Sequence, residues 1–378
     1  MISPRAFHET LAAEGVDFLA GVPDSLLKEF CAYVDAALPP EGHVIAANEG
    51  TAVGLAAGHH LATGSLPMVY LQNSGLGNTV NPLLSLADPQ VYAIPMIVLV
   101  GWRGAPGVKD EPQHVKQGRV TPALLDAMEL PYRVLDGDPD AATEAAAWAA
   151  QTARATGGPV VVLVHKGAFG KAEAKRPTRA VPDTMLAREA AIALITGALP
   201  GGATIVATTG MISRELYESR GASGQDRARD FLTVGSMGHA SQIALGIARA
   251  KPGAQVVCLD GDGAALMHLG GMATIGTSDT GDLLHVVLNN GAHDSVGGQP
   301  TVAQQISLTA IARACGYDRV EGPVEAEADI HAQVAALAQV PGRRFLEVRV
   351  RPGSRADLGR PKESPAQNKA QFIARLRG

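Results

Sequence analysis

Two short polar motifs in the second half of the chain combine residue types that could hold a metal ion and a diphosphate. Residues 260–263 read Asp-Gly-Asp-Gly, and residues 289–291 read Asn-Asn-Gly after an interval of 25 residues. Each motif follows an apolar run of strand length, and parallel sheets bind ligands at the carboxyl ends of their strands. Carboxylate and amide oxygens suit a hard ion such as Mg²⁺, and glycines before a helix let the backbone approach a phosphate. The pattern predicts a diphosphate held through a metal ion; two unrelated turns are the alternative.

The same glycines could instead belong to a dinucleotide-binding loop, whose GxGxxG pattern needs a third glycine. The position of that third glycine is Leu266 in the segment 261–266 and Val80 in the segment 75–80. Because both segments fail the pattern, the sequence argues against a nicotinamide-dependent dehydrogenase.

The composition describes a globular chain and excludes several classes of protein. Hydrophobic residues make up 46% of the 378 residues and charged residues 18%, so large buried cores are expected rather than disorder. A formal net charge of -5 and an aromatic content of 4% argue against nucleic-acid binding. The apolar runs are shorter than the roughly 20 residues of a membrane span, and three scattered cysteines fit a reducing compartment. We expect a cytoplasmic protein with no nucleic-acid or membrane partner.

Strand-like apolar runs alternate with helical stretches along the whole chain, as is typical of parallel sheets covered by helices on both faces. Helices are expected between the strands, among them 24–37, 49–62 and 267–276. The predicted strands are 18–21, 44–47, 68–72, 96–101, 132–135 and 160–165, then 204–207, 231–234, 256–260, 284–289, 319–321 and 344–350. The sequence thus predicts two consecutive doubly wound α/β domains, 1–168 and 184–378. A basic, proline-broken linker at 169–183 would join them.

The motifs at 260–263 and 289–291 resemble the magnesium–diphosphate signature of the thiamine-diphosphate-dependent decarboxylases, which lies in the second of two homologous α/β domains. The resemblance implies thiamine diphosphate and Mg²⁺ as cofactors, with Asp262, Asn290 and the carbonyl of Ala292 as metal ligands. It also implies cofactor contacts from small residues in the surrounding turns, namely Thr209, Gly210, Gly235, Ser236, Gly261, Gly263 and Ala264. Met237 would wedge between the two rings of the cofactor; a methionine that only fills the core is the alternative.

The same family requires a glutamate that follows a strand of the first domain, and Glu49 occupies that position in the segment 44–50. In the family this carboxyl hydrogen-bonds a pyrimidine nitrogen of the cofactor and promotes loss of the thiazolium proton. Burial in an apolar site would raise the pKa of such a carboxyl, as the role needs. A glutamate that only stabilises a helix N-terminus is the alternative. By position, Asp24 and His114 are further candidates for proton transfer.

Further stretches resemble a two-domain branch of the family that lacks a middle domain. That branch decarboxylates 3-phosphonopyruvate to phosphonoacetaldehyde and CO₂ in phosphonate natural-product biosynthesis. The matching stretches span nearly the whole chain, at 21–25, 72–78, 101–104, 109–117, 289–301 and 358–361. The resemblance implies a homo-oligomer, at least a dimer, with active sites at the subunit interface. Three alternatives stay open: a sulfopyruvate decarboxylase, another 2-oxo acid decarboxylase or carboligase, and a non-catalytic regulatory subunit. Intact Glu49, Asp262 and Asn290 argue against the last of these.

A small 2-oxo acid substrate with a second anion needs fixed cations beside the cofactor. The segment from Arg103 to Lys116 supplies them, with Lys109 and His114 in between, and Ser25 adds a hydroxyl at a strand end. An arginine binds two phosphonate oxygens at once, whereas a lysine acts as a point charge. A solvated basic loop, partly neutralised by its acidic neighbours, is the alternative.

Overall fold

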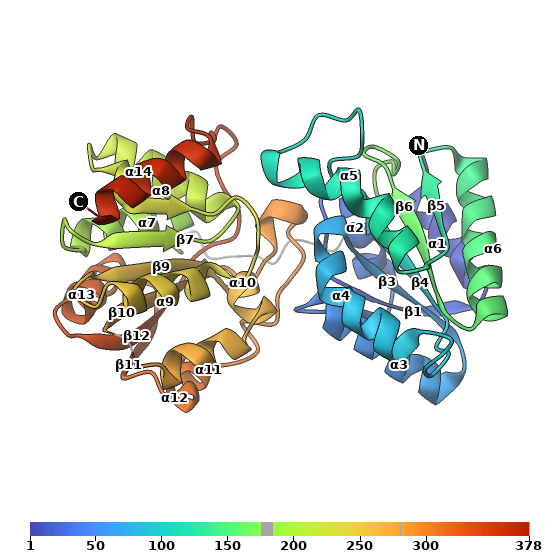
Figure 1. The fold of residues 1–378 in the computed structure, drawn as a ribbon, viewed down its shortest axis with the longest axis horizontal. Coiled ribbons are helices and arrows are strands. Elements are labelled where there is room, and N and C mark those ends of the chain that lie inside the picture. Colours follow the sequence, from blue (N-terminus) through green and yellow to red (C-terminus); the bar gives the residue numbers. More distant parts are fainter. Residues whose placement is uncertain (175–183, 280, 378) are drawn as a thin grey trace. The chain divides into compact units, whose positions relative to one another are not determined.

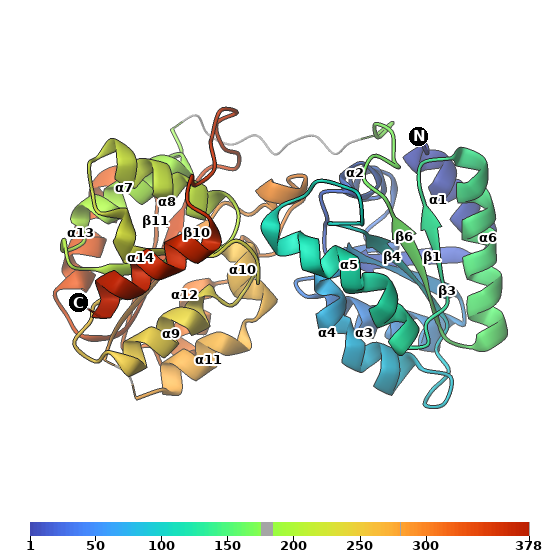
Figure 2. The same ribbon diagram turned by 45° about the horizontal axis from the view of Figure 1, so that its top comes forward.

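The computed structural model describes residues 1–174, 184–279 and 281–377. The chain divides into two compact units, Met1–Thr178 and Arg179–Gly378. Each unit contains one six-stranded parallel sheet with helices packed on both faces (Figures 1 and 2). The predicted fold, two consecutive parallel-sheet domains without a middle domain, is confirmed.

The sheet of the first unit is buried between two layers of helices, and all residues of β4 and β6 are buried. Helices α1, α2 and α6 cover one face, and α3, α4 and α5 cover the other. The strands are β1 (Val16–Gly21), β2 (His43–Ile45), β3 (Leu66–Gln72), β4 (Met96–Gly101), β5 (Tyr132–Leu135) and β6 (Pro159–Val164). The helices are α1 (Pro4–Ala13), α2 (Lys28–Ala37), α3 (Glu49–Thr63), α4 (Leu76–Pro82), α5 (Pro112–Ala127) and α6 (Pro139–Thr156).

The second unit has the same layered construction. Helices α7, α8 and α13 pack on one face of its sheet, and α9, α11 and α12 pack together on the other (Figure 1). The strands are β7 (Thr204–Ala207), β8 (Asp230–Leu232), β9 (Val256–Gly261), β10 (Asp282–Asn289), β11 (Arg319–Val324) and β12 (Gly342–Arg349). The helices are α7 (Arg188–Ala198), α8 (Met211–Ala222), α9 (Ala240–Ala250), α10 (Asp262–Met267), α11 (Gly270–Thr277), α12 (Leu308–Cys315), α13 (Glu327–Ala338) and α14 (Pro365–Arg377). Within the described parts of both units, every helix is too short or too polar to cross a membrane.

The two sheets share one strand order. The first sheet runs β2-β1-β3-β4-β6-β5, and the second, taken from its other edge, runs β8-β7-β9-β10-β12-β11. Both orders are second, first, third, fourth, sixth and fifth strand of the unit. The strand order reverses beside the first and third strands, which is where sheets of this kind bind ligands. Each strand end of one unit therefore has an equivalent in the other.

Helix α3 shows how local sequence places a side chain at a strand end. Asn48 caps the helix, since its Oδ1 accepts a hydrogen bond from the amide of Gly50 at 2.8 Å. Buried short side chains, among them Ala52 and Ala56, let the helix lie close to the sheet. The helix ends at Gly64, whose φ of 74° is left-handed. Glu49 is consequently fixed as the first helical residue.

Two helical predictions differ from the structure, and one further helix was not predicted. The helix predicted at 267–276 is two helices, because α10 already starts at Asp262 and the chain breaks at His268 with φ -128°. The helix predicted from residue 24 begins at Lys28, since the Asp24 carboxyl accepts hydrogen bonds from Leu26 and Leu27 and forms a turn there. Helix α1 was not expected.

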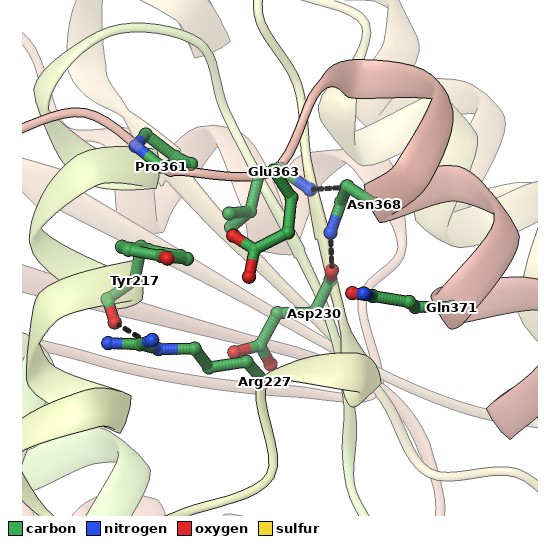
Figure 3. Close-up of a pocket in the computed structure, with 8 residues that line it drawn as sticks. Tyr217, Arg227, Asp230, Pro361, Glu363, Asn368 and Gln371 are labelled. Carbon is green, nitrogen blue, oxygen red and sulfur yellow. Dashed lines mark hydrogen bonds between the residues drawn. The ribbon is translucent and has the colours of Figure 1, made fainter.

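The segment after β6 and the C-terminus both pack against their own units. Phe169 pairs with Ile2 and is buried in the first core, so the predicted linker 169–183 begins with packed residues; residues 175–183 lie outside the described part. The C-terminal helix α14 lies against β8 (Figure 3). The Asn368 side chain accepts a hydrogen bond from the Leu232 amide at 3.1 Å and donates one to the Asp230 carbonyl at 2.9 Å. It therefore satisfies this backbone amide and this backbone carbonyl of the edge strand β8.

Candidate active site

Asp262 lies at the buried end of β9, where the chain turns into α10. It is 2% exposed, and its carboxyl accepts hydrogen bonds from the Thr301 hydroxyl and from the backbone amides of Gly263 and Asn290. Burial raises the pKa of this carboxyl to about 6, and these donors oppose the rise only in part. A buried carboxylate held by neutral donors gains stability from a bound cation, because a cation compensates the charge that water can no longer solvate.

The loop after β10 presents the second predicted metal ligand with its side-chain amide fixed. Asn290 Nδ2 donates to Asp294 Oδ2 at 2.6 Å, and Asn290 Oδ1 accepts from the amide of Ala292 at 3.1 Å. The backbone amide of Asn290 also bonds to the Asp262 carboxyl, so the neighbouring strands β9 and β10 bring both predicted ligands to one point. A carboxylate, an amide oxygen and the nearby carbonyl of Ala292 form an all-oxygen donor set, which fits Mg²⁺.

Two glycine turns lie beside these oxygen ligands. A Cβ placed on Gly263 would lie 3.4 Å from Met237 Cε and 3.3 Å from His293 Nδ1, so the three residues meet. A Cβ on Gly238 would lie 3.1 Å from the carbonyl oxygen of Ala264. The structure therefore places the 235–238 turn against the start of α10. Ser236 adopts a left-handed φ of 56°, which a non-glycine residue keeps only in a constrained loop.

The turn between β7 and α8 lies close to the loop after β10. Gly210 has a φ of 93°, and a Cβ placed there would lie 3.8 Å from Ser295 Cβ. Thr209 is half-buried, and next to it the hydroxyl of Thr208 is buried without a hydrogen-bond partner in the described part of the chain. A buried hydroxyl beside glycine turns suits the oxygens of a diphosphate, which accept hydrogen bonds.

Glu49 lies in the first unit at the end of β2 and is 5% exposed. Its Oε2 accepts a hydrogen bond from Asn78 Nδ2 at 2.7 Å. A Cβ on Gly75 would overlap the carboxyl group, so a larger residue at this position would displace the Glu49 side chain. Burial raises the pKa of Glu49, and the Asn78 hydrogen bond offsets part of the rise. The carboxyl therefore favours its protonated form more than an exposed glutamate does, as a proton-exchanging group requires.

Asp24 lies at the neighbouring strand end and is fully buried. Its Oδ1 accepts from Gln72 Nε2 at 2.6 Å, and its Oδ2 accepts from the amide of Leu26 at 2.9 Å. The carboxyl fits against Gly101, where any Cβ would overlap it. Burial raises the pKa of Asp24, while the Gln72 hydrogen bond and the nearby charge of Arg103 oppose the rise. Asp24 is thus a second buried carboxyl with a raised pKa in the same unit.

Arg103 follows β4 and forms hydrogen bonds with three residues, Asp110, Ser25 and Asn73. Its Nε donates to Asp110 Oδ2 at 2.7 Å, its Nη2 also bonds to the Asp110 carboxyl, and its Nη1 donates to Ser25 Oγ at 2.7 Å. Asn73 holds the backbone of Arg103 through two further hydrogen bonds. The guanidinium is consequently rigid, and the predicted pair Arg103 and Ser25 is in direct contact.

The remaining predicted substrate residues lie at or near the start of α5. His114 is 9% exposed, its Nδ1 has no hydrogen-bond partner among the described residues, and the same holds for Oε1 of Gln113. Burial, and secondarily the charge of Arg103, lowers the pKa of His114, so the neutral imidazole is favoured. Lys109 and Lys116 are exposed. The N-terminal turn of this 16-residue helix also carries backbone amides that attract an anion.

The structure thus gathers the predicted residues into two groups, one in each unit. Residues at the ends of β1 to β4 form the first group, and residues at the ends of β7 to β10 form the second. Sequence reasoning missed the supporting partners Asn78, Gln72, Thr301 and Asp294. All four fall in the stretches 72–78 and 289–301 that resemble the family, so their polar character was visible, but their contacts were not.

Comparison with known proteins places the chain in a family. Residues 4–130 match the model of the thiamine pyrophosphate enzyme N-terminal TPP binding domain, and residues 209–348 match the C-terminal TPP binding domain. The chain therefore belongs to the thiamine pyrophosphate enzymes, within the family that contains the phosphonopyruvate decarboxylases, and the predicted family and cofactor class are confirmed.

Three relatives give the particular resemblance. The chain is 37% identical to a phosphonopyruvate decarboxylase of Streptomyces viridochromogenes, over 99% of this chain and 95% of the relative. It is also 37% identical to a phosphonopyruvate decarboxylase of Streptomyces hygroscopicus, over 98% and 93% of the two chains. A sulfopyruvate decarboxylase of Methanosarcina acetivorans is 29% identical over 84% and 85%.

Proposed function

We propose that this chain is a carboxy-lyase that converts 3-phosphonopyruvate to phosphonoacetaldehyde and CO₂ with thiamine diphosphate and Mg²⁺. The observation that carries the proposal is the chemistry of the strand ends. Asp262 and Asn290 offer oxygen ligands at one point of the second unit, and Glu49 is a buried carboxyl with a raised pKa in the first. The similarity to phosphonopyruvate decarboxylases along nearly the whole chain supports the substrate.

The second unit would hold the cofactor by its diphosphate. Asp262, Asn290 and the Ala292 carbonyl would ligate Mg²⁺, and the turns at 208–210 and 261–264 would contact the phosphate oxygens. Met237 and its neighbours at 235–236 would support the rings. When bound, the cofactor supplies the carbon nucleophile and the electron sink for loss of CO₂ from a 2-oxo acid.

The first unit would move the protons. The raised pKa of Glu49 lets its carboxyl hold a proton and exchange it with a ring nitrogen. Asp24 and His114 would carry protons to or from the reacting carbon, because both are buried and their pKa values are shifted by burial toward the uncharged form. Asn78 and Gln72 fix the orientation of the two carboxyl groups through hydrogen bonds at 2.7 Å and 2.6 Å.

The start of α5 would bind the phosphonate group. The His114 ring has a buried nitrogen without a partner in the described residues, and the helix terminus adds backbone donors. Lys109 and Lys116 would add positive charge, while Arg103 would hold Ser25 and Asp110 in place and offer its two remaining N–H donors to the substrate. These donors and positive charges would stabilise a bound dianionic phosphonate more than an uncharged substituent, because hydrogen bonds to a charged group are stronger.

Assembly as a homodimer or larger oligomer is part of the proposal, with each active site built from Glu49 of one copy and Asp262 of another. The outer face of α3 supports it, since Leu61 is 71% exposed and Leu55 is 38% exposed beside the open positions Gly54 and Gly58. Tyr92, in the loop after α4, adds a further apolar side chain, 68% exposed. Exposed apolar side chains such as these are available for a subunit contact.

A substrate panel tests the proposed function. The purified protein, loaded with thiamine diphosphate and Mg²⁺, would be assayed for CO₂ release from 3-phosphonopyruvate, 3-sulfopyruvate and pyruvate. We expect kcat/KM to be highest for 3-phosphonopyruvate, and activity to disappear with a chelator and return with Mg²⁺. A preference for sulfopyruvate, which the 29% identical relative makes the second candidate, would replace the proposed substrate with a monoanionic sulfonate.

A further inference from the structure

We propose that Asp294 is a positioning residue that sets which end of the Asn290 amide faces the metal. This inference rests on the proposed role of Asn290 as a Mg²⁺ ligand, but it concerns a residue outside the ligand set. Asp294 opens the 3₁₀ turn η4 (Asp294–Val296) in the loop after β10.

The two ends of the Asn290 side chain contact groups of opposite hydrogen-bonding character. Nδ2 donates to Asp294 Oδ2 at 2.6 Å, and Oδ1 accepts from the Ala292 amide at 3.1 Å. A carboxylate only accepts hydrogen bonds and a backbone amide only donates. Turning the amide over would therefore place oxygen against oxygen and NH₂ against NH. The contacts allow one orientation, in which Oδ1 lies on the side of the Ala292 backbone.

Asp294 is itself immobilised by contacts from two other segments of the second unit. Its Oδ2 accepts from Arg188 Nη1 at 2.7 Å and from the amide of Gly353 at 3.0 Å. Arg188 begins α7, and Gly353 follows β12, so the carboxyl ties the loop after β10 to two distant parts of the second unit. Its side chain is 11% exposed.

Arg188 completes the arrangement by making a second ion pair with Glu215 of α8. Nε and Nη2 donate to the two Glu215 oxygens at 2.7 Å and 3.0 Å, and both side chains are buried. Arg188 holds the Asp294 carboxyl in place, because the two groups form an ion pair at 2.7 Å. Glu215 contacts the same guanidinium but not Asn290. The two carboxylates share Arg188, and of the two only Asp294 contacts the amide of Asn290 in the described part of the chain.

An amide whose orientation is fixed before the metal arrives presents its oxygen without first having to reorient. Residues that orient a metal ligand typically change metal affinity by about 10–100-fold when they are lost. We therefore expect Asp294 to act on metal affinity, while the Arg188–Glu215 pair acts on the stability of the unit.

The test measures Mn²⁺ binding rather than turnover. Mn²⁺ is titrated into the full-length apoprotein with saturating thiamine diphosphate, and the free ion is followed by its electron paramagnetic resonance signal. Asp294→Asn should raise the Kd for Mn²⁺ by at least about tenfold. Glu215→Gln, the same chemical change on the same arginine, should lower the thermal unfolding temperature and leave the Kd within about twofold. Asp294→Ala is the second variant should the first fail to fold.

Exchanging the residues at positions 290 and 294 shows whether Asp294 acts by orienting the Asn290 amide or only by packing in the loop. In an Asn290→Asp background either oxygen can face the metal, and the like charges at 290 and 294 repel. Adding Asp294→Asn to that background should therefore tighten Mn²⁺ binding, the opposite of its effect in the wild type. Three outcomes would overturn the role of Asp294 without touching the proposed function. They are equal Kd values for Mn²⁺ in the wild type and in folded Asp294→Asn, an equally large loss of Mn²⁺ affinity in Glu215→Gln, and weaker or unchanged Mn²⁺ binding when Asp294→Asn is added to Asn290→Asp. Absence of Mn²⁺ binding by the wild type would overturn the metal assignment of the proposed function as well.

Discussion

Equivalent strand ends of the two units carry different chemistry. The second strand of the first unit, β2, leads directly to the buried carboxyl of Glu49, whereas its counterpart β8 leads to the glycine-rich turn at 235–238. The third strand of the first unit, β3, ends in the amide of Gln72, whereas its counterpart β9 leads to Asp262. The shared strand order places equivalent residues at the ligand-binding edge of each sheet, and the type of residue that follows each strand determines the chemistry available there.

The partners of the carboxyl groups show the same contrast. Burial raises the pKa of the carboxyl groups in both units, but their partners differ: in the first unit, Glu49 and Asp24 each receive one hydrogen bond from a side-chain amide. In the second unit, Asp262 is held beside further oxygen ligands by Thr301 and backbone amides. The first arrangement favours a carboxyl that exchanges a proton, and the second favours a carboxylate that binds a cation. Each role can be tested separately.

The largest effect should follow Glu49→Gln, which keeps the shape of the side chain and removes its exchangeable proton. We expect kcat to fall by about 10²–10⁴-fold, the contribution of a general acid–base group. The Kd for Mn²⁺ should stay within about twofold, because the metal ligands are unchanged. Steady-state kinetics and metal titration measure the two quantities. Glu144→Gln, on the exposed face of α6, is the matched control and should change neither.

Asp262→Ala should have the converse effect. Loss of a charged ligand should weaken Mg²⁺-dependent binding of thiamine diphosphate by more than about 100-fold. Residues that only orient a metal ligand change metal affinity by up to roughly that factor. Excess Mg²⁺ and cofactor should restore part of the activity, which they cannot do for Glu49→Gln. Cofactor titration at several Mg²⁺ concentrations would reveal the difference. Wild-type cofactor affinity in Asp262→Ala, with the exposed Asp329→Ala as control, would refute the metal assignment.

Mixed oligomers test whether the two chemistries meet between copies of the chain. Glu49→Ala and Asp262→Ala subunits should each be inactive alone. After subunit exchange by random pairing in a two-fold dimer, about a quarter of the sites should combine two intact halves. Activity should therefore return to about that fraction of wild type. If differently tagged subunits exchange and activity stays absent, the proposed shared site is refuted.

A smaller effect should separate the charged residues near α5. Lys109→Ala should raise the KM for 3-phosphonopyruvate by up to about fivefold, since an exposed charge pair contributes up to ~1 kcal/mol. The KM for pyruvate should hardly change, because pyruvate has no second anion. Lys251→Ala, an exposed lysine after α9, serves as control. Equal changes for both substrates would show that Lys109 shapes the site without binding the phosphonate.

The pH dependence of stability gives the smallest expected difference. A carboxyl whose pKa is raised by folding binds more protons in the folded than in the unfolded state, so its contribution to stability falls as pH rises above about 4.5. Glu49→Gln has no titrating carboxyl at this position, so the variant does not lose this stability as pH rises. The unfolding temperature of the variant minus that of the wild type should therefore increase by a few degrees between pH 4 and pH 8.

Asp318→Asn gives the opposite sign and is the control for that measurement. Hydrogen bonds from Arg343 lower the pKa of Asp318, so its contribution to stability is present at neutral pH and is lost as pH falls. The unfolding temperature of Asp318→Asn minus that of the wild type should thus decrease from pH 4 to pH 8. The same sign in both variants would contradict the raised pKa of Glu49.

The amino-acid sequence alone determined the architecture and the candidate positions for the chemistry. Apolar runs such as Met96–Gly101 and Thr204–Ala207 coincide with strands because residues buried on both faces must be apolar throughout. Asp262 was a candidate because residues directly after a parallel strand lie at the ligand-binding edge of the sheet, and Glu49 was a candidate because the resembling family requires a glutamate after a strand of the first domain. Composition, spacing and family resemblance required no knowledge of contacts.

Only the tertiary structure decided which partners hold these residues and how far their chemistry is altered. Asn78 reaches Glu49, and Thr301 reaches Asp262, across intervals of 29 and 39 residues. Asp294 joins Asn290 to Arg188, which lies 106 residues away from it in the chain. No local pattern encodes such contacts, because they depend on how separate strands and loops pack. The raised pKa of each carboxyl follows from the same packing, since removal of water is a property of the folded chain.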